Sequence, residues 1–239
     1  MRKTGAVLPS PSPRAPRHAD LRSAIKSAAW KQIAEFGAPA LSLRAIARAL
    51  GVTAPAIYNY FRRRDDLVTA LIKDAFEDFG DSQLSAIEGV PTTDLVGRLR
   101  AGGMAYRQWA LKHPERYQLI FGAPIPGYVV PFEEVARIGA RSMRGLLAVV
   151  EALRMEGRLL VRSELPVEPA AIQMFDQWNK AAGNVDLQSF TAAILIWAHV
   201  HGLVSLEIGR NLPPMGPSAA MLYDLVVESI GREFVKDWK

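Results

Sequence analysis

Cysteine is absent from the 239-residue chain. This absence excludes a disulfide framework, a cysteine-rich zinc site and a thiol nucleophile, and it fits a reducing cytoplasm. Long apolar runs are also missing, because the longest stretch, residues 194–204, falls short of the roughly 20 residues that a membrane-spanning helix needs. Residues 1–19 are rich in Pro, Ser and Arg and lack the apolar core of a signal peptide. We therefore expect a soluble cytoplasmic protein with no membrane partner.

The usual sequence motifs of catalysis are missing as well. The chain has no Gly-rich phosphate loop ending in Lys-Ser/Thr, no zinc-protease motif on a helix and no nucleophile elbow. His199 and His201 are two residues apart, so on a helix they point to different faces and form a poor metal pair. We expect no enzymatic activity, no metal and no cofactor.

Charge is present but unevenly distributed. Residues 1–73 hold 13 Lys and Arg against 4 Asp and Glu, whereas the remainder holds 16 against 20. A basic end on a slightly acidic body is what a phosphate-binding region would show, because cationic side chains release counterions condensed on nucleic acid. Charge alone is explained equally well by a merely solvated basic face.

The N-terminal segment and the first helix are separated by their composition. Residues 1–19 carry four prolines and four basic residues, which predicts a disordered basic tail. From Asp20, a plausible N-cap, apolar residues recur at three- and four-residue spacing until Gly37, which predicts a helix.

Residues 41–61 contain two short predicted helices joined by a tight turn. The first starts from Ser42 as N-cap and breaks at Gly51, where a positive φ is easiest for glycine. The second starts after Thr53 as cap, with Pro55 in its first turn. This spacing predicts a helix-turn-helix, in which small Ala47 lets the two helices approach.

Beyond this motif the pattern stays helical. A fourth helix opens at residues 64–66 and runs toward residue 87, and further helices are predicted at 94–112, 114–121, 132–156, 168–181, 187–212 and 219–236. No segment shows a convincing period of two, although residues 159–161 are a candidate for a brief extended piece. We predict an all-α fold of about ten helices without a sheet.

The outer face of the second motif helix separates a functional interpretation from a structural one. A helix pair with no role in DNA binding needs the same glycine and apolar positions. Burial of Ile57 and Phe61, however, leaves a small, polar and aromatic face outside, and Arg44, Arg48 and a run of three arginines lie beside it. The outer residues are Ala54, Pro55, Ala56, Tyr58, Asn59 and Tyr60, and the run is Arg62, Arg63 and Arg64. Together they predict a surface that enters a DNA groove.

Residues 20–72 resemble the DNA-binding domain of TetR-family regulators. The matching positions are Ser42, Arg44, Ile46, Ala47, Gly51, Val52, Tyr58, Phe61, Asp65, Asp66 and Leu67. Tyr60 replaces the usual His and Arg64 the usual Lys, and both can still meet phosphate oxygens. The resemblance implies that Tyr58 and Arg64 anchor the DNA backbone and that Asn59 reads adenine. The predicted DNA-binding set is Arg44, Thr53, Ala54, Pro55, Ala56, Tyr58, Asn59, Tyr60, Arg63 and Arg64.

The C-terminal half resembles the family less sharply. Residues 197–202, Trp-Ala-His-Val-His-Gly, are similar to the Trp…His-Gly signature of one C-terminal subgroup. A core Trp beside a satisfied core His explains this spacing at least as well as a ligand contact does. The resemblance implies a small, largely hydrophobic effector that binds among aromatic and histidine side chains, which are also ordinary core residues at helical spacing. The candidates are Trp109, His113, Tyr117, Phe121, Trp178, Trp197 and His201.

We therefore predict three regions: a disordered tail at 1–19, a DNA-binding domain at 20–66 and a ligand-binding and dimerisation domain at 67–239. One recognition helix covers few base pairs, so two must read a palindromic operator of double-stranded DNA, and helices near 187–211 and 218–236 would pair the subunits as a homodimer in a four-helix bundle. By resemblance the protein is a repressor that the effector releases from DNA. The alternative is a helical small-molecule-binding or scaffold protein without regulated DNA release.

Overall fold

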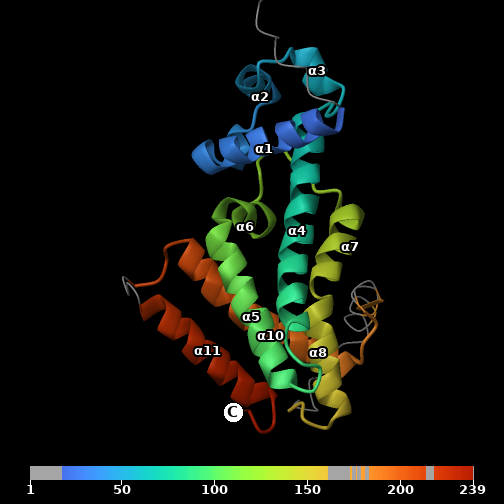
Figure 1. Ribbon diagram of the computed structural model, residues 1–239, viewed down its shortest axis with the longest axis vertical. Coiled ribbons are helices and arrows are strands. Elements are labelled where there is room, and N and C mark those ends of the chain that lie inside the picture. Colours follow the sequence, from blue (N-terminus) through green and yellow to red (C-terminus); the bar gives the residue numbers. More distant parts are fainter. Residues whose placement is uncertain are drawn as a thin grey trace, which may run out of the picture. The chain divides into compact units, whose positions relative to one another are not determined.

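The computed structural model describes residues 18–160, 183–213 and 218–238, together with residues 173, 176, 179 and 180 (Figure 1). Residues 1–17 of the predicted tail and most of the predicted helix at 168–181 lie outside the described residues. The described part contains ten α-helices and one 3-10 helix, which confirms the all-α fold. Contacts divide the chain into two units, residues 1–64 and 65–239. The assignment of DNA binding to 20–66 and of ligand binding and dimerisation to 67–239 stays a prediction.

The first unit, called the head below, consists of α1 (His18–Phe36), η1 (Ala38–Ala40), α2 (Leu43–Leu50) and α3 (Ala54–Tyr58). The predicted N-cap at Asp20 is wrong, because α1 already begins at His18 and Asp20 lies in its first turn. The buried side of α1 follows the predicted spacing, with Ile25, Ala29 and Ile33 in the core.

The second unit, called the body, is built from longer helices. They are α4 (Arg64–Glu88, whose first residue belongs to the head), α5 (Leu95–Lys112), α6 (Pro114–Phe121), α7 (Phe132–Ser142), α8 (Arg144–Met155), α10 (Leu187–Ile208) and α11 (Ser218–Phe234). Helix α10 packs against α5, α8 and α11, and α5 packs against α6 and α8 (Figure 1). Of the piece predicted at 159–161, Leu159 forms one antiparallel bridge to Val235, and residue 161 lies outside the described residues.

Helix α10 is long and apolar enough, by length and composition alone, to cross a membrane. Its packing is that of a core helix, because Phe190, Ile196 and Val204 are buried against neighbouring helices. It ends at Ile208, four residues before the predicted end, since Arg210 adopts a left-handed φ of 55° and the Asn211 N–H donates to the Leu206 carbonyl at 2.8 Å. Such a left-handed residue closes a helix C-terminus.

The single helix predicted at 132–156 is two helices, α7 and α8, separated at Met143. The Ser142 hydroxyl donates to the Gly139 carbonyl at 2.7 Å, and the Met143 N–H donates to the carbonyl of Ala140, three residues back. Ser142 also meets α4 closely, because a Cβ added at Gly80 would lie 2.9 Å from the Ser142 Cα. The chain bends here because the hydroxyl bonds the backbone of its own helix and the last turn is tightened. Neither feature interrupts the apolar pattern in the sequence.

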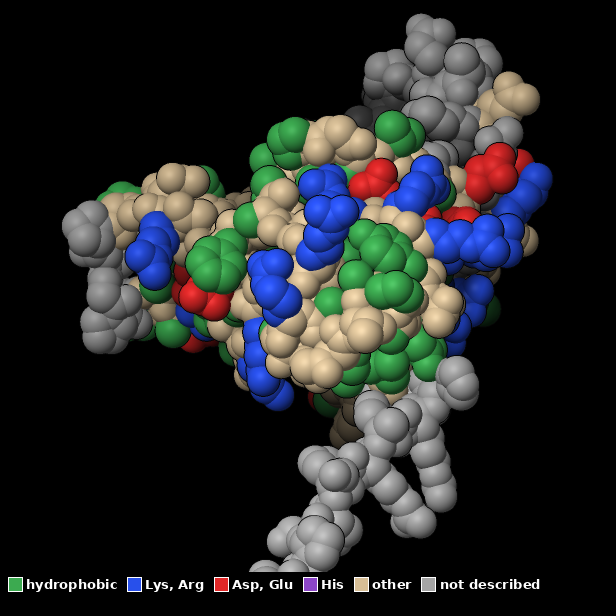
Figure 2. All heavy atoms as spheres, turned by 90° about the horizontal axis from the view of Figure 1, so that it is seen from above, with side chains coloured by type: hydrophobic (Ala, Val, Ile, Leu, Met, Phe, Trp, Pro, Cys, Tyr) green, Lys and Arg blue, Asp and Glu red, His purple; other side chains and the backbone are tan. Residues whose placement is uncertain are grey.

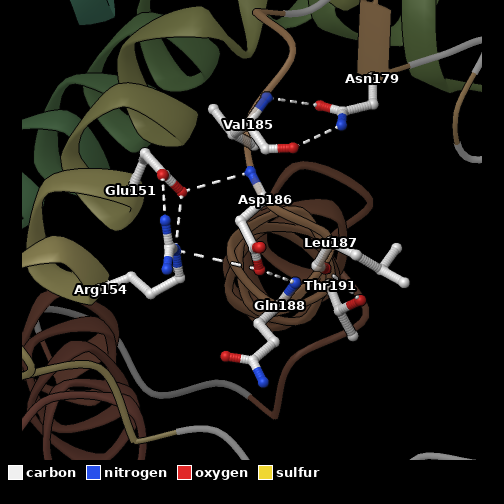
Figure 3. A network of polar contacts seen from close by, with 8 residues as sticks. All are labelled: Glu151, Arg154, Asn179, Val185, Asp186, Leu187, Gln188 and Thr191. Carbon is white, nitrogen blue, oxygen red and sulfur yellow. Dashed lines mark hydrogen bonds and ion pairs between the residues drawn. The ribbon is translucent and has the colours of Figure 1, made fainter.

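A polar network fixes the start of α10 against α8 (Figure 3). The Glu151 carboxylate accepts hydrogen bonds from the Arg154 guanidinium at 2.6 Å and from the Asp186 N–H at 3.4 Å. The Asn179 side chain bonds the Val185 backbone in both directions, at 2.6 and 3.0 Å. The hydrogen bond from Arg154 lowers the pKa of Glu151 to about 2, so the Glu151 carboxylate is ionised at neutral pH.

Candidate nucleic-acid interface and ligand cavity

The turn between α2 and α3 is built by a capped helix and a left-handed glycine. The Ser42 hydroxyl accepts the Ala45 N–H at 3.4 Å, as an N-cap does. Gly51 has φ 66° and ψ 27°, and the Val52 N–H that follows donates to the Ala47 carbonyl at 3.0 Å. These features confirm the predicted cap and turn. Thr53 takes the N-cap position of α3, but its hydroxyl makes no capping hydrogen bond, so this part of the prediction is wrong.

The inward side of the motif is closed. Ile46, Ala47, Ile57 and Phe61 are all buried in the head, with exposed fractions of 3% or less. The Arg22 guanidinium of α1 lies 5.0 Å from the centre of the Phe61 ring, a cation–π contact that covers the edge of this core. Helix α3 is therefore held by its buried side, and its orientation on α1 and α2 follows from side-chain packing.

The outward side of the motif carries the residues predicted to bind DNA. Exposed side chains are those of Arg44, Thr53, Pro55, Tyr58, Asn59 and Arg63, and half-buried ones are those of Ala54, Ala56, Tyr60 and Arg64. Asn59 directly follows α3 and keeps helical angles, φ −66° and ψ −22°. The Arg64 guanidinium donates to the Pro39 carbonyl at 3.4 Å, which draws this side chain toward η1. The structure thus brings the predicted set together on the head, and their contacts with DNA stay predictions.

This surface is positively charged. Residues 18–64 contain eight Lys and Arg against two acidic residues. In Figure 2, a view from above, Lys and Arg side chains border an area of hydrophobic and uncharged surface. Basic groups around a small-residue helix face are suited to phosphates on either side of a groove, with the uncharged face turned to the bases.

In the body, His201 stands at the centre of an aromatic cluster. Its Nδ1 lies 2.8 Å from the Tyr106 hydroxyl and 3.1 Å from that of Tyr117, and the Trp197 ring stacks on it at 4.9 Å. The Phe121 ring meets the imidazole edge-on, also at 4.9 Å. Burial lowers the pKa of His201, so the ring is neutral at pH 7 and Nδ1 can accept a hydrogen bond from a tyrosine hydroxyl. Four predicted ligand residues, and Tyr106 in addition, therefore form one cluster.

Two other predicted ligand residues serve the packing of the body. Trp109 is 5% exposed, and its indole N–H donates to the Asp78 carboxylate at 2.9 Å. His113 joins α5 to α6, as C-cap of one and N-cap of the other, and burial lowers its pKa. Trp178 lies outside the described residues. Neither Trp109 nor His113 lines the body cavity between α4 and α10.

That cavity lies between α4, α6, α7 and α10 and has a volume of about 360 Å³. Among the described residues predicted to bind a ligand, Phe121 and Trp197 line it. Sequence reasoning missed the aliphatic side of the wall, including Ile72, Val130 and Val135, because these residues carry no chemical signal beyond their apolarity. Trp197 also lines a smaller cavity of about 50 Å³ against α5, α8 and α11.

Comparisons with known proteins agree with the geometry of both units. Residues 25–71 match the family model of bacterial regulatory proteins of the tetR family, and residues 99–230 match the tetracyclin repressor-like C-terminal domain. The chain belongs to the TetR family. It is thus a DNA-binding transcriptional regulator of the helix-turn-helix class. The C-terminal match does not identify the Trp…His-Gly subgroup, which stays a prediction.

Among related proteins, HTH-type transcriptional regulator Rv1816 of Mycobacterium tuberculosis is 32% identical over 74% of this chain and 76% of its own length. The crystal structure of regulatory protein SCO4313 is 33% identical, with a TM-score of 0.71 over 90% of this chain and 98% of that chain. A SmeT–triclosan complex shares the fold at 16% identity, with a TM-score of 0.60 over 90% and 92% of the two chains.

Proposed function

We propose that the protein is a cytoplasmic homodimeric repressor that holds a palindromic operator through α3 and releases it when a small, largely hydrophobic molecule binds the body. The observation that carries this proposal is the two-sided construction of α3. Its inward residue Ile57 is fully buried, while Tyr58 and Asn59 next to it are exposed among basic residues. The proposal assigns no catalytic role to any residue.

In this proposal the exposed residues divide into two roles. Tyr58, Arg63 and Arg64 bind phosphate oxygens and position the head without regard to sequence. The Asn59 amide is suited to reading adenine, because it can donate to N7 and accept from N6 at once. Ala54 and Ala56 are small enough to let the helix approach the base edges.

Dimerisation is supported by the apolar outer faces of α10 and α11. Leu195 and Leu206, three helical turns apart on α10, are 40% and 44% exposed, and Met221 and Leu225, one turn apart on α11, are each 66% exposed. A Cβ added at Gly202, between the two α10 leucines, would meet nothing within 4 Å. Large exposed side chains on adjoining helices are typical of an interface, and pairing two copies would complete a four-helix bundle.

The experiment compares two double variants by titration against a duplex that the protein has selected from a random library. Arg44→Ala with Arg48→Ala removes two charges from α2, and Arg137→Ala with Arg141→Ala removes two exposed charges from α7 as a matched control. We expect the α2 pair to lose at least about tenfold in affinity at low salt, because each phosphate contact contributes counterion release. The α7 pair should change affinity by less than about twofold. Equal losses would contradict the proposed surface.

A further inference from the structure

The body cavity has the size of a small-molecule site and a wall of one chemical kind. Its volume of about 360 Å³ lies within the roughly 300–1,000 Å³ typical of ligand pockets. Phe76 and Phe79 of α4, Val135 of α7 and Ile194 of α10 form parts of the wall, and none of the described residues that line it has an ionisable side chain. A charged ligand would lose its hydration there and gain no partner, whereas an apolar ligand would lose only unfavourable contact with water.

Ser142, which lines this cavity, and His201, which stacks on the lining residue Trp197, are already bonded within the protein. The Ser142 hydroxyl donates to the Gly139 carbonyl at 2.7 Å. His201, one of the predicted ligand residues, has Nδ1 beside the Tyr106 hydroxyl at 2.8 Å and Nε2 beside the Ser205 hydroxyl at 3.3 Å. Both nitrogens of this ring are therefore engaged in the body, and recruiting either for a ligand would break an existing hydrogen bond.

We propose that the cavity between α4, α6, α7 and α10 binds an uncharged, apolar molecule without a buried polar anchor, and that this molecule is the effector. The second half of this statement rests on the proposed function, and the first half does not. The proposed site differs from the predicted one in two ways. Trp109 and His113 do not line it, and aliphatic residues that follow α6 in the chain form part of its wall.

The cavity is attached to α4 on its rim, which provides a route from occupancy to the head. The Tyr128 hydroxyl bonds that of Thr69 at 2.9 Å, and Glu134 of α7 pairs with Lys73 of α4. The segment from 128 to 139 therefore carries both part of the cavity wall and two polar attachments to α4. Because α4 is one continuous helix from Arg64, a ligand that moves this segment changes the forces on a helix that begins in the head.

Two fluorescent probes of the same skeleton test the site directly and without DNA. N-phenyl-1-naphthylamine is uncharged, and 8-anilinonaphthalene-1-sulfonate adds a sulfonate. We expect the uncharged probe to bind one molecule per protomer and at least about tenfold more tightly than the sulfonate, because the wall offers that charge no partner. Equal affinity for the two probes would overturn the proposal.

Two variants place the uncharged probe in this cavity. Ala136→Phe puts a ring into the wall and should weaken binding at least about tenfold, whereas Arg137→Phe puts the same ring on the exposed side of α7 and should stay within about twofold. Val130 lies at the rim and is 45% exposed, so we expect the fold to accept a polar replacement there. Val130→Lys should raise the affinity for the sulfonate relative to the uncharged probe. Thermal unfolding of each variant confirms folding, and unchanged affinity in a folded Ala136→Phe protein would place the site elsewhere.

A separate measurement with the selected duplex tests the effector role. Saturating N-phenyl-1-naphthylamine should release the duplex from the wild-type protein and from Arg137→Phe, but not from Ala136→Phe. If the probe fills the cavity while the duplex stays bound, the effector role is overturned although the binding site stands. If the duplex is never bound, the proposed function fails, and the probe titrations still decide on the cavity.

Discussion

Head and body use their charged side chains in opposite ways. In the head, Arg44 lies exposed beside α3, where an ion in solution or a phosphate can reach it. In the body, the Arg107 guanidinium is 13% exposed and bonds both oxygens of Glu207, at 2.8 and 2.6 Å. The two arginines therefore differ in what they contact: Arg107 holds two body helices together, whereas Arg44 is exposed to a binding partner of the protein.

The largest expected effect concerns the head and salt. If each protomer neutralises several phosphates through its basic side chains, a dimer makes roughly 6–10 contacts, and raising salt from about 50 to about 200 mM should weaken DNA binding by about a thousandfold or more. The measurement is a binding titration at several salt concentrations. A DNA affinity that does not change with salt would show that the exposed arginines do not bind phosphates, and it would contradict the contrast between the two units.

Arg107→Ala should reveal the opposite use of charge. Removal of one partner from a largely buried pair leaves Glu207 unpaired, so unfolding free energy measured with urea should fall by about 3 kcal/mol. Arg44→Ala, matched in chemistry but exposed, should change stability by less than about 0.5 kcal/mol and act on DNA affinity instead. Similar stability losses in both variants would contradict the distinction between head and body.

Within the head, positioning and reading should separate. Asn59→Ala should cost about 1–3 kcal/mol at its cognate base pair and relax the preference there, whereas Tyr58→Phe should weaken selected and random duplexes alike. Paired titrations on both kinds of duplex measure this. If Asn59→Ala lowers both affinities equally, the amide contacts a phosphate, and α3 reads the bases through another residue.

The smallest effect concerns pH and the body. Burial lowers the pKa of His201 below its value in the unfolded chain, so the unfolded state takes up more protons as pH falls. This contribution to stability is complete above the unfolded pKa near 6.5 and is lost on acidification below it. Urea unfolding between pH 7 and 5 should show this slope, and His201→Gln should make it shallower. An unchanged slope in the variant would assign the titration to another group.

The sequence was most informative where local chemistry alone determines the structure. Ser42 and Gly51 could be placed in advance because an N-cap and a left-handed turn each need particular residue types within a few positions. The break at Met143 could not, because Ser142 and Met143 leave the apolar spacing intact, and the close approach of Gly80 to Ser142 joins positions more than sixty residues apart. The pattern of residues within a few positions does not show where two distant helices come close.

The ligand site shows the same limit. Aromatic spacing brought Tyr117, Phe121, Trp197 and His201 forward as a group, and the structure does cluster them. The sequence pattern could not separate Trp109, which is packed and bonded to Asp78, from Trp197, which lines the cavity. Whether an apolar residue faces a core or a cavity depends on how neighbouring helices pack, and Val130 and Val135 look identical to core residues in the sequence.

Selection of bound sequences from a random duplex library shows whether the protein reads DNA as a dimer through α3. Two α3 surfaces related by a twofold axis should enrich an inverted repeat, with half-sites about one helical turn, roughly 10 base pairs, or a multiple of it apart. Asn59→Ala should enrich the same repeat with one position in each half-site relaxed. Enrichment of a single half-site, or of no sequence at all, would contradict the account of a dimer that reads DNA through α3.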